Sequence, residues 1–146
     1  MPSAVHFQVV VGSTVEKIAE PNQPVARDFT FEMPADYAGN SRTSAILHFM
    51  AHPSRDPGAD FQVQFILNGR LIYRYGPSSA DFVRAFQVVF GSSRLVPGTN
   101  TLTIKRIRGE ATLGVSSVVV WYWQYIDTTA PARGKPKPKA AAKAGK

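Results

Sequence analysis

Three histidines are the first residues in this chain whose type and spacing suggest a chemistry: His6, His48 and His52. On a helix, the four-residue spacing of His48 and His52 would place both imidazoles on one face as metal ligands. The surrounding residues alternate as in a β-strand, where this spacing separates two side chains by about 13 Å. A weaker candidate for zinc, manganese or calcium is the following loop, which carries His52, Asp56 and Asp60. We expect ordinary polar loop residues there and no bound metal.

The residue types needed for catalysis are present, but no recognisable pattern combines them. No Gly-x-Ser-x-Gly motif occurs, and no pair of carboxylates stands out for glycoside hydrolysis. The chain also lacks a glycine-rich phosphate loop and a dinucleotide fingerprint, so no cofactor is expected. The absence of cysteine excludes a thiol nucleophile and a disulfide scaffold. These observations predict a non-catalytic protein.

The composition is that of one ordinary folded domain. The chain has 146 residues, 44% of them hydrophobic, and no apolar run reaches the length of about 18 residues that a membrane span requires. The first residues lack the basic segment of a signal peptide. The expected location is therefore cytoplasmic by default, with non-classical export left open.

The net charge of +7 is concentrated at the C-terminus. The rest of the chain, residues 1–132, holds 11 basic and 10 acidic side chains, so it has no excess of basic residues of the kind that a nucleic-acid-binding domain needs. Residues 128–146 are rich in Lys, Pro and Ala without a large apolar side chain, which predicts a disordered tail. The tail would attract polyanions in a salt-sensitive way or act as a solubilising extension; it supports neither base stacking nor membrane insertion. Its basic residues are Arg133, Lys135, Lys137, Lys139, Lys143 and Lys146.

Before the tail, short β-strand patterns dominate the chain. Runs rich in Val, Ile, Phe, Tyr and Thr alternate with turn residues, and no window holds a helical period for three turns. The pattern predicts an antiparallel jelly-roll-like β-sandwich of eight or nine strands over residues 1–127, with one helical turn at most near Ser79–Ala85. The expected strands are Val5–Val11, Thr14–Ala19, Ala26–Glu32, Thr43–Ala51, Phe61–Leu67, Leu71–Tyr75, Phe86–Phe90, Thr101–Arg106 and Val115–Tyr125.

The dipeptide Asn68-Gly69 is the sharpest local signal. Between two strand-like runs it predicts a type I′ hairpin turn, because both central residues must adopt positive φ. A regular hairpin would place Phe65 opposite Ile72 and Gln64 opposite Tyr73. The predicted core face then carries Phe61, Val63, Phe65 and Ile72. The predicted outer face carries Gln62, Gln64, Ile66, Leu71, Tyr73 and Tyr75.

Two further segments have a strand pattern of their own. In Leu95–Ile104 a Pro-Gly turn precedes a strand on which Leu102 and Ile104 point inward. The last strand is apolar on both faces, so it is buried on both sides or is covered by something outside this fold. Its two sets are Val119, Trp121, Trp123 and Tyr125 on one face, and Val118, Val120 and Tyr122 on the other.

The order of these segments resembles a galactose-binding-like jelly-roll sandwich. The matching residues run from Phe65 to the Asn68-Gly69 turn, from Leu95 to Ile104 and from Val115 to Trp123, within residues 43–125. Many lectins and carbohydrate-binding modules share that fold, so the resemblance implies a carbohydrate-binding function. The calcium loop that recurs in the family has no recognisable counterpart near Ala19–Arg27.

A carbohydrate site needs aromatic rings that stack on sugars and amide or imidazole groups that hydrogen-bond hydroxyls. In this hypothesis the loops 52–60 and 76–84 set selectivity. The same aromatic residues would also suit a subunit contact, so homo-oligomer assembly in a phage or secretion-type particle is the alternative, with nucleic-acid association through the tail as a third. They could also fill the core or face solvent without a ligand. The expected ligand-binding residues are Tyr73, Tyr75, Gln62, Gln64, His48, Trp121 and Trp123.

Overall fold

The computed structural model describes residues 3–20, 22–37, 39, 42–53, 60–76 and 83–125. Within these ranges no helix is long and apolar enough to cross a membrane. The predicted tail, residues 128–146, lies outside the described residues, as does most of both predicted selectivity loops. The elements are β1 (Ser3–Val11), β2 (Glu16–Ile18), β3 (Ala26–Met33), β4 (Ser44–Pro53), β5 (Gln62–Leu67), β6 (Arg70–Tyr75), β7 (Arg84–Gly91), the 3₁₀ helix η1 (Ser92–Arg94), β8 (Gly98–Arg108) and β9 (Leu113–Tyr125).

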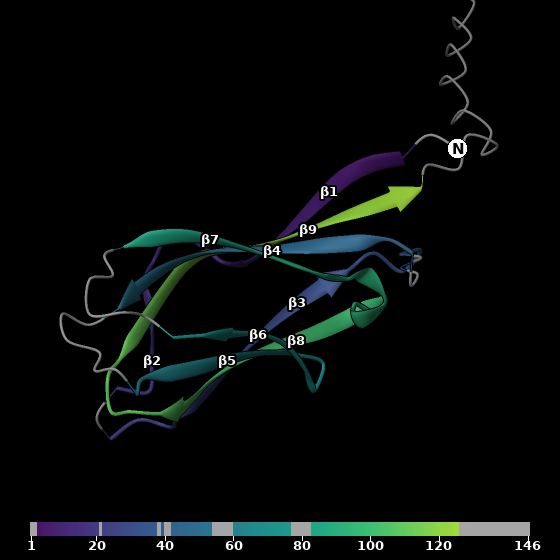
Figure 1. The fold of residues 1–146 in the computed structure, drawn as a ribbon. Helices are drawn as coiled ribbons and strands as arrows, with labels where there is room; N and C mark the ends of the chain where they lie inside the picture. The colour runs from purple at the N-terminus through teal and green to yellow at the C-terminus, as the bar shows by residue number, and fades with distance from the viewer. Residues whose placement is uncertain are drawn as a thin grey trace, which may run out of the picture.

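The strands form two antiparallel sheets packed face to face (Figure 1). The first sheet has the order β1-β9-β4-β7, with β2 paired to the other end of β9, and the second has the order β3-β8-β5-β6. The predicted all-β antiparallel sandwich is therefore confirmed. Each predicted strand is present, although several begin or end a few residues away from the predicted bounds. Of the segment expected to form a helical turn, residues 79–82 lie outside the described residues, and Arg84 and Ala85 lie in β7; the short helix η1 follows that strand.

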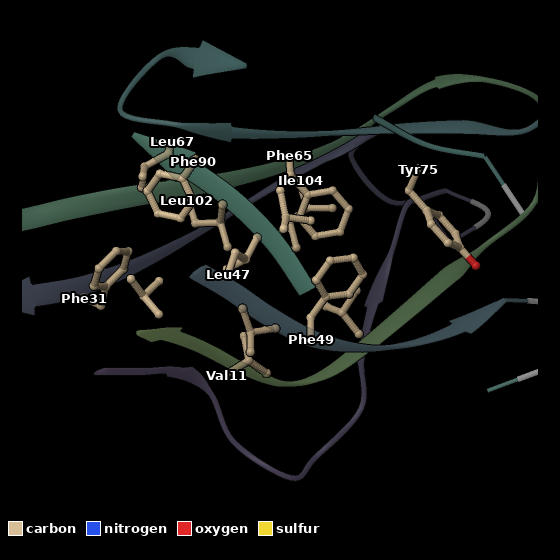
Figure 2. Packing of buried hydrophobic residues seen from close by; sticks show 14 of the residues in the cluster. Val11, Phe31, Leu47, Phe49, Phe65, Leu67, Tyr75, Phe90, Leu102 and Ile104 are labelled. Atoms are coloured by element: carbon tan, nitrogen blue, oxygen red, sulfur yellow. The ribbon is translucent and has the colours of Figure 1, made fainter. Parts of the chain in front are cut away.

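The hydrophobic core lies between the two sheets (Figure 2). Strand alternation places every second side chain there, and large aromatic residues from opposite sheets meet in the middle. The rings of Phe49 on β4 and Phe65 on β5 stack with centroids 4.5 Å apart, and both side chains are fully buried. This core gives both sheets a rigid backbone on which outward-facing residues are positioned.

The Asn68-Gly69 turn adopts the predicted conformation, with φ of 49° and 76°. The Asn68 amide also reaches across the sheet end and donates a 2.8 Å hydrogen bond to the Asn100 side chain. Asn100 is fully buried, and its amide donates to the carbonyls of Val96 and Gly98 while its oxygen accepts from the Val96 N–H. The Asn68-Gly69 turn and the segment Leu95–Ile104, which are far apart in the sequence, are thus joined by one network of hydrogen bonds.

Candidate functional site

A β-bulge in the β5–β6 hairpin overturns part of the predicted site. Pairing starts as predicted, with Ile66 opposite Leu71, but Phe65 then pairs with Tyr73 and leaves Ile72 as the extra residue. A bulge shifts the alternation beyond it by one residue, so each later side chain changes face. Gln64 consequently lies opposite Arg74, and the predicted Gln64–Tyr73 pair is wrong.

The two tyrosines of this hairpin lie on the core side of the sheet. The side chain of Tyr75 is only 2% exposed, and Figure 2 shows its ring at one end of the buried cluster. Tyr73 packs against Phe49 and Phe65, and this burial raises its pKa above the ordinary value. The prediction that both tyrosines share an outer face with Gln62 and Gln64 is therefore wrong.

The two glutamines point away from the core on the second sheet. Val63 and Phe65, which alternate with them, are completely buried, whereas Gln62 and Gln64 are half-buried on the outer side. Their neighbours across the sheet are polar: Lys105 lies opposite Gln64, and Arg108 lies opposite Gln62.

The tryptophans lie on the outer face of the first sheet. Trp121 and Trp123 are 40% and 49% exposed, whereas Val118 and Val120 on the opposite side of β9 are buried in the core. The last strand is therefore not buried on both sides, because the tryptophans do not fill the core. His48 on β4 also faces outward, opposite Val119 of β9.

These residues belong to a continuous surface, which we call the aromatic face. It is formed by the outward-facing side chains of β1, β9, β4 and β7, and none of those that the structure describes is Asp, Glu, Lys or Arg. Its members are Val5, Phe7, Val9, Ser44, Ile46, His48, Met50, Ala85, Gln87, Val89, Val119, Trp121 and Trp123.

Strand pairing arranges the aromatic face in rows. Phe7 lies opposite Trp121, Trp121 opposite Ile46, and Ile46 opposite Val89, so one apolar row crosses four strands. The Phe7 and Trp121 rings are tilted by 43° with centroids 5.2 Å apart. The neighbouring row contains His48 and, opposite it on β7, Gln87.

A shallow hollow of about 190 Å³ lies beside the two tryptophans. Its lining combines both indole rings with groups that can hydrogen-bond, since Ser44 and Gln87 contribute to it. An aromatic wall next to polar, uncharged groups suits a ligand with apolar and hydroxyl surfaces and no charge. The remaining lining residues are Val5, Ile46 and Tyr122.

The other end of the first sheet has a different character. His52 Nε2 lies 2.9 Å from Ser116 Oγ, and this hydrogen bond joins β4 to β9. Ser116 is 5% exposed, and Val15 lies directly over the neighbouring Gly114. The serine therefore has little access for a substrate, and the pair reinforces the sheet.

The structure does not bring together the weak metal candidate from the sequence. His52 bonds Ser116, Asp60 is exposed, and Asp56 lies outside the described residues. In the part of the chain that the structure describes, no group of three or more His, Asp or Glu side chains could hold a metal ion.

Sequence reasoning missed the contribution of β1 to the aromatic face. Val5, Phe7 and Val9 are 49%, 56% and 54% exposed, although such alternation is usually typical of a core face. No local signal could have found them, because His6 and Gln8 on the other side are polar and so strengthen the resemblance to a core-facing strand. His6 stacks on Tyr122, with ring centroids 5.8 Å apart.

No protein-family model matches this sequence, and no curated protein does. The fold is similar to part of BuGH86 in complex with neoagarooctaose, with a TM-score of 0.52 and 15% identity over 84% of this chain and 19% of that one. It is also similar to part of dimeric latent PorU from Porphyromonas gingivalis, with a TM-score of 0.49 and 11% identity over 83% of this chain and 12% of that one. A family 35 carbohydrate-binding module from Clostridium thermocellum has a TM-score of 0.46 and 13% identity, over 81% of this chain and 90% of that one.

This chain spans less than a fifth of the length of BuGH86 and of PorU. At 15% identity, the similarity to BuGH86 shows a common fold. It agrees with the jelly-roll-like sandwich that the sequence predicts.

Proposed function

We propose that this chain is a non-catalytic module that binds an uncharged polysaccharide on the aromatic face. The observation that carries the proposal is the exposure of Phe7, Trp121 and Trp123 together on the aromatic face, whose described outward side chains include no Asp, Glu, Lys or Arg. A contiguous exposed apolar patch of this kind is typical of a binding surface. Exposed apolar residues that lie singly are found on any protein and indicate nothing.

The chemistry of the face matches the two kinds of surface on a sugar ring. Aromatic rings pack against the C–H groups of a pyranose, and uncharged polar side chains hydrogen-bond its hydroxyls. Here the rings come from β1 and β9, and the hydrogen-bonding groups are Ser44, His48 and Gln87. The described outward-facing side chains of these four strands carry no formal charge, which favours a neutral ligand, since a charged group would lose hydration without gaining a partner.

The arrangement suits an extended chain better than a single sugar. Trp121 and Trp123 are two residues apart on one strand, so their positions are separated by about 6.7 Å along β9. The hollow beside them is shallow at about 190 Å³, so it cannot enclose a long ligand. A polysaccharide lying along β9 would contact both indoles in succession. The similarity to part of BuGH86, which was solved in complex with neoagarooctaose, agrees with a carbohydrate ligand.

The second candidate function is self-association through the same face. The observation that favours it is the exposure of aliphatic side chains beside the rings: Val5, Val9 and Val89 are 49%, 54% and 67% exposed. Aliphatic groups pack well against a second protein surface, but they cannot form a hydrogen bond with a sugar hydroxyl.

The test compares Trp121→Ala with a matched control, Leu71→Ala. Leu71 is also 40% exposed, but it lies on the outer face of the second sheet. Affinity electrophoresis in gels containing agarose, xylan or a mixed-linkage glucan would measure binding, and light scattering would measure the oligomeric state. We expect one of these neutral polysaccharides to retard the wild type, and Trp121→Ala to weaken retardation about tenfold, which corresponds to about 1.4 kcal/mol. The control should behave as the wild type.

Two results would contradict the proposal. The first is a polysaccharide that retards wild type and Trp121→Ala equally. The second is a wild type that no gel retards and that forms a concentration-dependent oligomer dissociated by Trp121→Ala, which would establish self-association instead.

A further inference from the structure

The outer face of the second sheet carries a cluster of basic and amide side chains that the aromatic face does not explain. We propose that this cluster is a second binding site, for the sulfate or carboxylate groups of an acidic polysaccharide. We call it the cationic cluster; its residues are Arg74 on β6, Gln62 and Gln64 on β5, and Lys105 and Arg108 on β8. The site lies on the opposite sheet from the aromatic face and goes beyond the proposed function.

The pairing register brings these residues into two adjacent rows. In the first row Gln64 lies between Arg74 on one neighbouring strand and Lys105 on the other. Strands are about 4.8 Å apart, so the backbones at Arg74 and Lys105 flank that of Gln64 at about 9.5 Å from each other. In the second row Gln62 lies opposite Arg108.

Two β-bulges create this arrangement. The bulge at Ile72 gives Gln64 an arginine as its neighbour on β6 where a regular hairpin would give it Tyr73. A second irregularity lies between Gln62 and Val63, because Val63 pairs with Arg106 whereas Gln62 pairs with Arg108. The omitted residue, Ile107, is the extra one, and Arg108 thereby lies on the outer side with Gln62.

The second bulge lies between Arg106 and Arg108, and it directs their side chains to opposite sides of the sheet. Arg106 is half-buried and donates hydrogen bonds to the carbonyls of Ala19 and Ala111, so it is committed to the fold. Arg74, Lys105 and Arg108 are exposed. Only the exposed set is presented to a ligand.

In the described part of the chain, none of the three exposed cations forms an ion pair with a carboxylate. Other cations there do form ion pairs, as Lys17 does with Glu20 and Arg27 does with Glu16. The outward-facing carboxylates of the same sheet lie on β3, where Asp28 accepts a hydrogen bond from Thr103 and Glu32 accepts one from Thr99. The carboxylates closest to the cluster in sequence, Asp60 and Glu110, lie in the loops beyond this end of the sheet.

The residue types favour an acidic polysaccharide over other polyanions. A guanidinium binds a planar carboxylate or a sulfate with two parallel hydrogen bonds, and a lysine adds a point charge. The glutamine amides between the cations can bond the hydroxyls that separate charged groups along a sugar chain. The described residues of this face include no outward-facing aromatic side chain, so the bases of a single-stranded nucleic acid would find nothing to stack on.

The test uses the full chain and two triple variants that remove the same charge. The first is Arg74→Gln/Lys105→Gln/Arg108→Gln; the control, Lys137→Gln/Lys139→Gln/Lys143→Gln, removes three cations from the tail. Titration with dextran sulfate and with polygalacturonate, with uncharged dextran as the blank, would measure affinity at several salt concentrations. We expect the first variant to bind one acidic polymer at least tenfold more weakly and with a shallower salt dependence, and the control to lose about twofold at most.

Equal losses in the two variants, or a larger loss in the tail variant, would overturn the proposal, because binding would then follow net charge alone. Single-stranded DNA that binds as tightly as dextran sulfate, with the same dependence on the cluster, would also overturn it in favour of nucleic acid. The outcome is separable from that of the proposed function, since the first triple variant keeps Trp121 and its retardation by a neutral polysaccharide should not change.

Discussion

The two outer faces of the sandwich differ in composition although the same fold builds them. Both sheets place large apolar residues inward at alternate positions, as Phe49 does in the first and Phe65 in the second. Their outward positions diverge: the first sheet presents valine, phenylalanine and tryptophan, and the second presents threonine, glutamine and charged residues. Inward packing imposes similar demands on both sheets, so it does not account for the divergence of their outer faces.

Where β3 and β8 pair, the second sheet has the pattern of an antiparallel sheet with water on one side. Its threonines lie in a regular row and hydrogen-bond neighbouring carboxylates, as in Thr103–Asp28. The first sheet departs from that pattern at Phe7 and Trp121, which gain nothing from water. The comparison therefore supports the proposal that a neutral polysaccharide binds on the first sheet.

The largest expected effect distinguishes the inside of the first sheet from its outside. Phe49→Ala should lower the free energy of unfolding by about 3–5 kcal/mol, because this fully buried ring leaves a cavity. Phe7→Ala should cost less than about 1 kcal/mol, since that ring is already 56% exposed. Urea denaturation followed by tryptophan fluorescence measures both. Comparable losses would mean that the outward ring contributes to the fold and is not available for a ligand.

A smaller effect concerns charge on the two faces. Val89→Arg places a cation in the row that contains Trp121, at a side chain that is 67% exposed. We expect affinity for a neutral polysaccharide to fall about tenfold, while the free energy of unfolding changes by less than about 0.5 kcal/mol. The matched control, Thr30→Arg on β3 of the second sheet, should change neither quantity. If both variants bind as the wild type does, the ligand does not lie across this row.

The smallest effect tests whether the threonine row on β8 is an ordinary solvated surface with which the aromatic face can be compared. Thr103→Val removes the hydroxyl that bonds Asp28 at 2.6 Å and keeps the β-branched shape. Because this hydrogen bond is exposed, we expect the free energy of unfolding to change by less than about 0.5 kcal/mol. Neutral-polysaccharide binding should stay the same. A loss above about 1 kcal/mol in urea titration would show that the threonine row is structural and not simply solvated.

Local signals predicted much of this fold. Alternation and turn residues located the strands, and the positive φ that Asn68-Gly69 requires located one hairpin turn. The last strand was recognised as apolar on both sides, and the structure buries one side in the core while it leaves Trp121 and Trp123 on the other side exposed. These features depend on residues close together in the chain.

The residues of the proposed site could not be predicted in the same way. The expected set mixed residues from the core, such as Tyr75, with residues from two opposite faces, such as Gln64 and Trp121. Phe7 was missed because its partner Trp121 lies more than a hundred residues away, so neither local pattern reveals the pairing.

The sequence alone determined the type and order of the elements, because propensity, alternation and turn geometry act within a few residues. The tertiary structure decided which side of each strand is inside. That choice depends on bulges such as the one at Ile72, where one unpaired residue turns Tyr73 inward and Arg74 outward. It depends as well on strand pairs far apart in sequence, which bring Phe7 to Trp121 and Asn68 to Asn100. Both are settled by the best packing of the whole core, a property that no single segment carries.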